Sequence, residues 1–467
     1  MYGRCSPVRT AAVVRRGALA RRSSSSAGGG GGRAATLEKF EGSVMKTYGR
    51  YDIVLSHGAG REVWDADGKR YLDMGGGIAV NALGHSHPEV VDVIQEQATK
   101  LVHCSNLYYT EPQGQLGDAL AGLFADGRAD AGGKIFFCNS GAEANEGMFK
   151  LARAWGQRDG VDTDPATAKY EIITAENSFH GRTVAAIAAT GQDKIKAGFG
   201  PMIPGFKHVA FNDLQAAADA VGPQTAAIMI EGIQGEGGIM PATVDYLLGL
   251  RKLCDERGIL LLFDAVQCGH FRSGRFQSYQ TILEEASASG NAEAAAFMPD
   301  AVSMAKSLGA GVPIGGFWVA EKHAGLLSAG MHGTTYGGNA MACAVGHKVI
   351  EIVHRDGLEE NIRAVGDQFA EGFSKLCAAY PTVIADHRGL GLMRGIVLQP
   401  KEQIPGFADQ DGSPSGQFVN KLHELGMLTV GSGDQVVRVL PPFNTTHAEA
   451  EEALSHIETA AKFAAGL

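Results

Sequence analysis

The chain has 467 residues, which exceeds the size of one average hydrophobic core, and two domains are therefore expected. Hydrophobic residues make up 45% of it, yet no apolar run approaches the roughly 18 residues needed to span a bilayer. The formal net charge of -10 disfavours contact with the phosphate backbone of nucleic acids. The composition therefore favours a globular protein with neither a membrane nor a nucleic-acid partner.

The first 36 residues differ in composition from the rest. They hold seven arginines, no acidic residue and no lysine, together with runs of serine at 23–26 and of glycine at 28–32. This composition is typical of an organellar transit peptide, and the lack of a continuous apolar stretch argues against a secretory signal. We expect residues 1–44 to be a transit-peptide-like disordered segment that directs the protein to the mitochondrial matrix. The alternatives are the plastid stroma, or the cytoplasm if the segment is not a transit peptide.

The cysteines number seven and are scattered along the chain without any Cys-x-x-Cys pair, which fits reduced thiols. Cys268 and His270 lie two residues apart, as do His85 and His87, but no further ligands cluster near either pair. We therefore expect no metal site.

After the N-terminal segment, residues 45–95 are predicted to form the first part of a small domain. Residues 51–73 alternate between apolar and polar in the manner of strands, with a hairpin signal near their centre. A glycine-rich link then leads to predicted helices at 88–101 and 113–124.

Strands and helices alternate in the large domain predicted at 96–345. Strands are predicted at 134–139, 170–174, 226–231 and 259–264, and helices at 143–155 and 244–257. The run at 259–264 is continuously apolar until its last residue, which is the pattern of a parallel strand covered on both faces. This alternation predicts an α/β fold with a mostly parallel, three-layer sheet. Residues 284–296, rich in alanine and glutamate, are predicted to be a surface insertion without chemistry.

Residues 346–467 are predicted to form a C-terminal small domain of the α+β class. A long amphipathic pattern at 342–380, interrupted at Asp356 and Gly357, leads into it. Its other predicted elements are strands at 395–398, 428–430 and 436–440 and helices at 416–425 and 448–463.

Two charged residues stand in apolar surroundings at the end of this alternating region. Asp264 ends the apolar strand at 259–264, at the sheet edge where α/β proteins bind ligands. Lys306 is a lone amine among small and apolar residues. A desolvated lysine has a lowered pKa and can form a Schiff base, while a fixed aspartate can keep a pyridinium nitrogen protonated. The pair suggests pyridoxal phosphate, although each residue alone could be an ordinary surface or capping residue.

Three loops add groups suited to such a cofactor. Residues 140–145 follow a strand and open a helix, so that unpaired backbone N–H groups can bind phosphate. The loop at 178–183 carries Phe179, which can stack on a planar ring, and Arg182, which can hold a carboxylate. Residues 332–339 supply hydroxyls and backbone amides in a second glycine-rich loop.

Taken in order, these segments strongly resemble the class III, pyridoxal-phosphate-dependent aminotransferases of fold type I. The resemblance extends from about residue 48 to the C-terminus and is closest in GHSHPEV at 84–90, CSNLYY at 104–109, FCNSGAEAN at 137–145 and the loop through Arg182. It implies a fold type I transferase, with a large domain that binds pyridoxal 5′-phosphate and a smaller α+β domain.

The resemblance also assigns roles around the ring of the cofactor. Lys306 is implied to be the catalytic residue, which bonds to the cofactor and later moves a proton. Asp264 would pair with the pyridinium nitrogen and Gln267 would bond the ring hydroxyl. Phe179 and Val266 would sandwich the ring.

The phosphate group of the cofactor is implied to bind at two places. Gly141 and Ala142 would hold it through their backbone amides. Thr335 would reach it from the partner subunit of a homodimer, whose active site would lie at the interface.

Four residues are implied to bind the substrates, a small-molecule amino donor and 2-oxoglutarate. Arg182 would clamp the α-carboxylate, with Thr334 near the substrate. Glu236 would pair with Arg438, so that one pocket accepts both a donor with a neutral or cationic tail and the second carboxylate of 2-oxoglutarate.

Within the family, the likeness is closest to members that use N2-acetyl-L-ornithine as the donor, in arginine biosynthesis. The shared motifs leave open another ω-aminotransferase acting on ornithine, succinyl-diaminopimelate, succinylornithine or 4-aminobutyrate, an aminomutase, or a non-catalytic cofactor-binding protein. The chain departs from the usual family pattern at three positions. It has Ala265 where glutamate is usual, and Gly232 and Ala340 where proline is usual.

Overall fold

A computed structural model describes residues 32–126, 128 and 132–467, and the chain divides into two compact units at Val54. Of the predicted transit-peptide-like segment, residues 1–31 lie outside the described residues. The described part of the first unit contains α1 (Arg33–Ser43), an exposed helix that falls within the segment expected to be disordered. The second unit, Leu55–Leu467, contains all the elements that follow.

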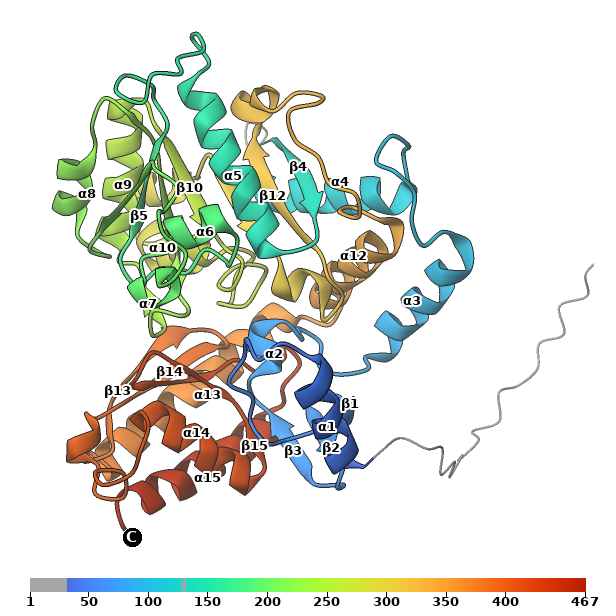
Figure 1. Cartoon of the computed structure of the whole chain (residues 1–467), viewed down its shortest axis with the longest axis vertical. Coiled ribbons are helices and arrows are strands. Elements are labelled where there is room, and N and C mark those ends of the chain that lie inside the picture. Colours follow the sequence, from blue (N-terminus) through green and yellow to red (C-terminus); the bar gives the residue numbers. More distant parts are fainter. Residues whose placement is uncertain (1–31, 127, 129–131) are drawn as a thin grey trace, which may run out of the picture. The chain divides into compact units, whose positions relative to one another are not determined.

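The centre of the second unit is a seven-stranded sheet (Figure 1). Its strands, in spatial order, are β4 (Gly133–Cys138), β12 (Gly315–Ala320), β11 (Ala301–Met304), β10 (Leu260–Asp264), β7 (Thr225–Glu231), β5 (Glu171–Ala175) and β6 (Phe206–Val209). β12 is antiparallel to both of its neighbours, whereas the other paired strands are parallel. The prediction of a mostly parallel α/β sheet is confirmed, although the predicted strands do not include β6, β11 and β12.

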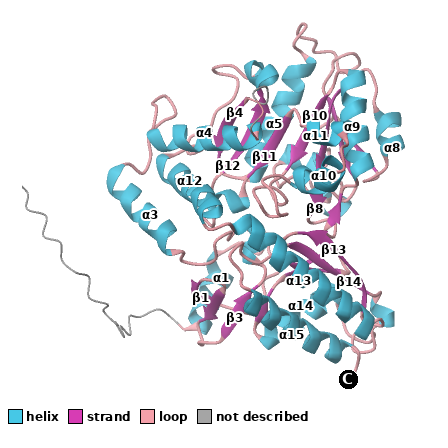
Figure 2. Cartoon of the chain, turned by 180° about the vertical axis from the view of Figure 1, so that it is seen from behind, coloured by secondary structure: helices cyan, strands magenta, loops and turns pink. Residues whose placement is uncertain are grey.

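Helices cover both faces of this sheet, as the side chains of β10 demonstrate. Leu260 and Leu262 pack in one cluster with α5 (Gly141–Gly156), on the face seen in Figure 1. Leu261 and Phe263 belong to the larger cluster, which contains α4 (Glu111–Ala125), α9 (Val244–Arg257) and α12 (Ala340–Arg355). Figure 2 shows α4 and α12 from that side. Full burial of a side chain of this size contributes roughly 1.5–3 kcal/mol, so a continuously apolar strand is stable here.

Local sequence fixes where these helices begin and end. Ser140 caps α5, because its hydroxyl accepts a hydrogen bond from the Glu143 amide at 3.3 Å. Thr243 caps α9 in the same way, and Gly258 follows the last residue of α9 with a φ of 59°, which glycine adopts most readily. The capped start of α5 faces the carboxyl ends of the strands, where ligands bind in such folds.

The C-terminal part of the unit forms a separate antiparallel sheet. Its strands, in spatial order, are β13 (Ile384–Leu390), β14 (Met393–Leu398), β17 (Val436–Val439) and β16 (Val430–Ser432). It is accompanied by α13 (Leu358–Ala379), α14 (Pro414–Leu425) and α15 (His447–Ala464), in the lower half of Figure 1.

The first strands of the unit join the C-terminal part in a further sheet. β1 (Leu55–Ala59), β2 (Glu62–Asp65) and β3 (Arg70–Asp73) are antiparallel, and β15 (Met427–Leu428) adds to β3 in parallel. This sheet combines strands from both ends of the unit, as expected for the predicted small domain. The domain boundaries predicted at 45, 96 and 346 stay predictions.

Shorter elements complete the unit. They are α2 (Gly76–Ala79), α3 (Pro88–Lys100), α6 (Val184–Ala189), α7 (Asp193–Lys196), α8 (Leu214–Ala220), β8 (Ile233–Gln234), β9 (Met240–Pro241), α10 (Ser278–Ala288) and α11 (Ala292–Ala296). The predicted insertion at 284–296 covers the end of α10 and all of α11, and it buries Ala294 against the core.

The part of the chain that the structure describes contains no helix long and apolar enough to cross a membrane. The same residues contain no group of three or more metal-binding side chains.

Candidate active site

A cavity of about 430 Å³ lies beyond the carboxyl ends of β4, β7 and β10. Nine of the predicted site residues line it: Gly141, Ala142, Phe179, Arg182, Glu236, Asp264, Val266, Gln267 and Lys306. Arg438 contacts two of these residues, Glu236 and Gln267, while Thr334 and Thr335 line a different cavity. The loops at 140–145 and 178–183, Asp264 and Lys306 therefore converge on one site, although they are far apart in the chain.

Asp264 lines the cavity and is held by three hydrogen bonds of 3.0 Å or shorter. Its Oδ2 accepts from the Asn145 amide at 2.7 Å and interacts with Nδ1 of His180 at 2.8 Å. Its Oδ1 accepts from the backbone N–H of Val266 at 3.0 Å. These contacts fix the carboxylate, which is only 3% exposed, in an orientation toward the cavity.

Two buried ionisable groups surround Asp264. Burial opposes the charged form of His180, but the hydrogen bond and charge of Asp264 raise the pKa of the imidazole. Burial also raises the pKa of Glu231 to about 7. The Glu231 carboxyl accepts hydrogen bonds from the backbone of Phe179 at 2.8 Å and of Gly235 at 3.1 Å, and so links two loops of the site.

Lys306 begins a short 3-10 turn directly after β11 and is half-buried in the cavity wall. Its φ of 45° lies in the left-handed region, which costs backbone energy for a residue with a side chain. Burial lowers the pKa of its amine to about 8, with the nearby charge of Glu236 acting in the opposite direction. A fraction of the amine is therefore neutral and nucleophilic near neutral pH.

The start of α5 forms a cradle for an anion. The backbone N–H groups of Gly141 and Ala142 lie in the first turn, where they have no carbonyl partner within the helix. A Cβ atom at Gly141 would lie 2.6 Å from Cγ1 of Val266, so a larger residue would crowd the wall. Gly181, with a φ of 129°, brings the next loop against Ala142.

Arg182 and Phe179 lie on that next loop. The Arg182 guanidinium is 5.5 Å from the centre of the Phe179 ring, and the arginine is exposed at the cavity mouth. An exposed guanidinium at this place can bind the carboxylate of an entering substrate.

Glu236 and Arg438 form an ion pair at the edge of the cavity. Nη1 and Nη2 of Arg438 donate to Oε1 and Oε2 of Glu236 at 2.6 and 3.2 Å. The Arg438 side chain is 3% exposed and that of Glu236 is 28% exposed. Although burial opposes ionisation, the charge of Arg438 lowers the pKa of Glu236. The two residues expected to meet across the chain do so.

Thr334 and Thr335 lie in a second cavity of about 1110 Å³, together with Tyr108 and Tyr109. Asn139, which lines the first cavity, donates a hydrogen bond to the Thr334 hydroxyl at 3.3 Å. Within one chain, therefore, the two threonines stand behind the wall of the site and not inside it.

Three polar residues that hold Asp264 or the loops around it were not among the predicted ones. They are Asn145, His180 and Glu231. Asn145 and His180 stand inside the motifs at 137–145 and 178–183, and their place in these motifs was the signal that could have identified them. Glu231 is distinguished only as a carboxylate that ends an apolar strand.

A sequence profile of the family described as Aminotransferase class-III matches residues 44–461. An acetylornithine aminotransferase of Caldanaerobacter subterraneus subsp. tengcongensis is 41% identical over 415 residues, which cover 89% of this chain and 96% of that protein. The acetylornithine aminotransferase of Gloeobacter violaceus is 40% identical over 421 residues, covering 90% and 96% of the two chains.

Solved structures lead to the same family. The N-acetylornithine aminotransferase of Stenotrophomonas maltophilia K279a superposes with a TM-score of 0.71 at 32% identity, covering 88% of this chain and 96% of its own. The ornithine aminotransferase of Toxoplasma gondii ME49 has a TM-score of 0.80 at 27% identity, covering 92% and 94%. The cavity, the sequence match and the shared fold agree, and the chain therefore belongs to the class-III aminotransferases.

Proposed function

We propose that this chain is an acetylornithine aminotransferase. It transfers the δ-amino group of N2-acetyl-L-ornithine to 2-oxoglutarate and yields N-acetyl-L-glutamate 5-semialdehyde and L-glutamate, a step of arginine biosynthesis. The observation that carries this proposal is one cavity that combines the Lys306 amine, the Asp264 carboxylate and the Glu236–Arg438 pair. The acetylornithine aminotransferases at 40–41% identity support the choice of donor.

As a class III aminotransferase, the chain uses pyridoxal 5′-phosphate. The residues present fit this group, because a fixed carboxylate, a desolvated amine and unpaired helix N–H groups face one cavity. When bound, the cofactor supplies an electron-withdrawing ring and an aldehyde carbon for carrying the amino group. The Asp264 carboxylate would hold the ring nitrogen in its protonated form, because His180 and Asn145 fix that carboxylate in place.

Other residues of the cavity would hold the rest of the cofactor. Gln267 would bond the ring hydroxyl, Phe179 and Val266 would cover the two faces of the ring, and the amides of Gly141 and Ala142 would bind the phosphate.

Lys306 is the residue that we propose for covalent attachment and proton transfer. With its pKa lowered to about 8, its neutral amine can accept a proton from the δ-carbon of the donor.

Three side chains at the edge of the cavity would hold the substrates: Arg182, Glu236 and Arg438. Arg182 would bind the carboxylate of the entering substrate. With Glu236 paired to Arg438, the pocket presents no second free guanidinium to the donor, whose single carboxylate would be bound by Arg182. When 2-oxoglutarate enters, Arg438 would exchange Glu236 for the second carboxylate.

We also propose a homodimer in which each chain completes the site of the other. Exposed apolar residues surround the cavity that holds Thr334 and Thr335, among them Leu107 at 87% and Tyr109 at 104% exposure. A surface of this kind favours association. Covering it with a second chain would let Thr335 reach the partner's phosphate site.

For the location of the protein we propose the mitochondrial matrix, on the composition of residues 1–36. A fluorescent protein fused behind residues 1–44 should enter mitochondria. Accumulation in plastids or in the cytoplasm would instead support one of the two alternatives.

A competition among donors tests the proposed activity. Purified full-length protein with cofactor would receive 2-oxoglutarate and N2-acetylornithine, ornithine, 4-aminobutyrate or succinyl-diaminopimelate, with glutamate formation as the readout. We expect the highest kcat/KM for N2-acetylornithine. A higher value for ornithine would favour the second candidate, ornithine transamination, which the match to the Toxoplasma gondii ornithine aminotransferase recommends. Product formation without 2-oxoglutarate would favour an aminomutase.

A further inference from the structure

Glu236 stands on a hairpin that is too short to hold itself in place. β8 and β9 make only two residue pairs, Ile233 with Pro241 and Gln234 with Met240. An isolated hairpin is at best marginally stable in water even when it is longer. The position of the Glu236 carboxylate therefore depends on what binds the turn between these strands, residues 235–239.

Ser432 at the end of β16 binds this turn on both sides of Glu236. Its hydroxyl accepts a hydrogen bond from the Gly238 amide at 2.9 Å. As a donor, the same hydroxyl lies 2.9 Å from the carbonyl oxygen of Gly235 and 2.8 Å from the carbonyl oxygen of Glu236. Ser432 is 3% exposed, so water cannot readily replace these bonds.

Arg388 on β13 binds the same turn from a second direction. Its Nε donates to the Gly238 carbonyl at 2.6 Å. The backbone of Gly238 is thus held at its N–H by Ser432 and at its carbonyl by Arg388.

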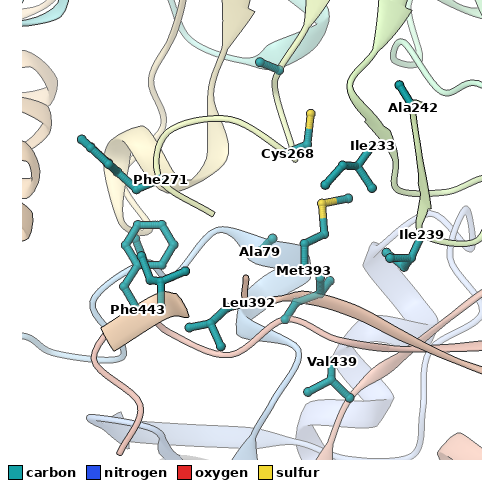
Figure 3. Packing of buried hydrophobic residues seen from close by; sticks show 14 of the residues in the cluster. Ala79, Ile233, Ile239, Ala242, Cys268, Phe271, Leu392, Met393, Val439 and Phe443 are labelled. Atoms are coloured by element: carbon teal, nitrogen blue, oxygen red, sulfur yellow. The ribbon is translucent and has the colours of Figure 1, made fainter. Parts of the chain in front are cut away.

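Packing adds a third anchor at Ile239, which Figure 3 shows beside β14. Ile239 is fully buried, and Cβ atoms at Gly389 and Gly395 would lie 2.9 and 3.0 Å from its side chain, so that two glycines form a slot for it. Its φ of 54° is unfavourable for a β-branched residue. A strained conformation persists only where surrounding contacts impose it, which indicates that the turn is forced onto the antiparallel sheet.

Arg438 also has anchors outside the turn. It lies on β17, and Nη2 donates to the Gly431 carbonyl at 2.9 Å. A change that loosens the turn would therefore leave the guanidinium in place and withdraw Glu236 from it.

We propose that Ser432, assisted by Arg388, is a positioning residue that sets the balance between the two substrates by holding Glu236 over Arg438. The inference rests on the proposed function, because it concerns the exchange of an acetylated donor for 2-oxoglutarate in one pocket. A firmly held Glu236 keeps the guanidinium neutralised while the donor, which has a single carboxylate, is bound. A loosely held Glu236 leaves the guanidinium open to a carboxylate.

The test compares Ser432→Ala with Ser415→Ala in the holoenzyme. Ser415 is a matched control, since it is 2% exposed and donates to the Gly433 carbonyl at 2.9 Å in the neighbouring turn. In Ser432→Ala we expect faster amide hydrogen exchange in residues 233–241. We also expect a KM for 2-oxoglutarate that falls and a KM for N2-acetylornithine that rises, each by about two- to ten-fold, as loss of one hydrogen bond predicts.

Opposite movement of the two KM values is a result that general destabilisation would not produce. Unchanged exchange, or KM values that move together, would overturn the proposal, as would faster exchange with both KM values unchanged. Arg388→Met provides a second variant at a half-buried position, in which the same three changes are expected.

Hydrogen exchange and titration of the holoenzyme with 2-oxoglutarate need no turnover. If the wild-type protein does not accept N2-acetylornithine, the proposed function fails, and these two measurements still decide whether Ser432 holds the turn and shields Arg438.

Discussion

Replacing Glu236 by glutamine should make the protein bind 2-oxoglutarate more tightly. The Glu236 carboxylate accepts hydrogen bonds from both terminal nitrogens of Arg438, at 2.6 and 3.2 Å. Since the Arg438 side chain is only 3% exposed, the second carboxylate of 2-oxoglutarate must displace Glu236 to reach it. Glutamine keeps the size of the side chain but removes its charge, so displacement becomes easier.

The size of this effect follows from the chemistry of the pair. A hydrogen bond to a charged group contributes about 1.5–3 kcal/mol and one between neutral groups about 0.5–1.5 kcal/mol. The 28% exposure of the Glu236 side chain allows water to screen part of the difference. A net gain of about 1–2 kcal/mol corresponds to a KM for 2-oxoglutarate that is about 5- to 30-fold lower.

Glutamate formation at saturating N2-acetylornithine, with 2-oxoglutarate varied, measures this KM directly. Glu293→Gln, at an exposed position on α11, is the control and should leave the KM unchanged. An equal or higher KM in Glu236→Gln, with normal cofactor content, would refute the view that Glu236 competes with the substrate carboxylate.

Three further changes test the site and the fold. Lys306→Ala should retain the cofactor but lower glutamate formation by at least about 100-fold, because the proton-transferring amine is gone; unchanged turnover would contradict the mechanism. Gly141→Ala places a methyl group 2.6 Å from Val266, an overpacking cost of about 1–3 kcal/mol that should raise the Kd for pyridoxal phosphate about 5- to 150-fold in a titration of the apoprotein. Gly122→Ala, with open space around the added atom, serves as the control, and equal Kd values would refute the steric argument. Burial and the charge of Lys196 lower the pKa of His208 to about 4, so the unfolded state binds the extra proton between pH 6.5 and 4. Urea unfolding should therefore show stability falling with pH below about 6.5, by less than about 1.4 kcal/mol per pH unit for a partly exposed ring. His208→Gln should flatten this dependence, and identical slopes would exclude His208 as its source.

The sequence predicted the parts of the site that depend on strand ends. Asp264 follows a continuously apolar strand, and Ser140 begins a helix directly after another, so both had to reach the same edge of a parallel sheet. The pairing of Glu236 with Arg438 spans a separation of 202 residues, and no local pattern encodes it. It was anticipated only from the family resemblance, as were the roles of Gln267 and Val266.

Other features escaped prediction for physical reasons. β12 opens with Gly315 and Gly316, which weaken a strand pattern, and its direction is set by pairing and not by its own residues. The insertion at 284–296 has a surface-like composition because α10 and α11 bury only one side. The role of Thr335 at the phosphate site of a partner chain stays a prediction, because a single chain carries no periodic signal for a second one.

The pairing of β12 with β4 has a consequence for the order in which the protein can fold. β4 lies at the edge of the large sheet, and its strand neighbour there is β12, which pairs Gly315 with Cys138. During synthesis, β4 and the start of α5 must wait for about 180 further residues before that edge can close. The chain has by then produced both Asp264 and Lys306, whereas Arg438 is still to come. The cradle for the phosphate can thus be completed before Arg438, the last of the residues proposed to bind a substrate, has been made.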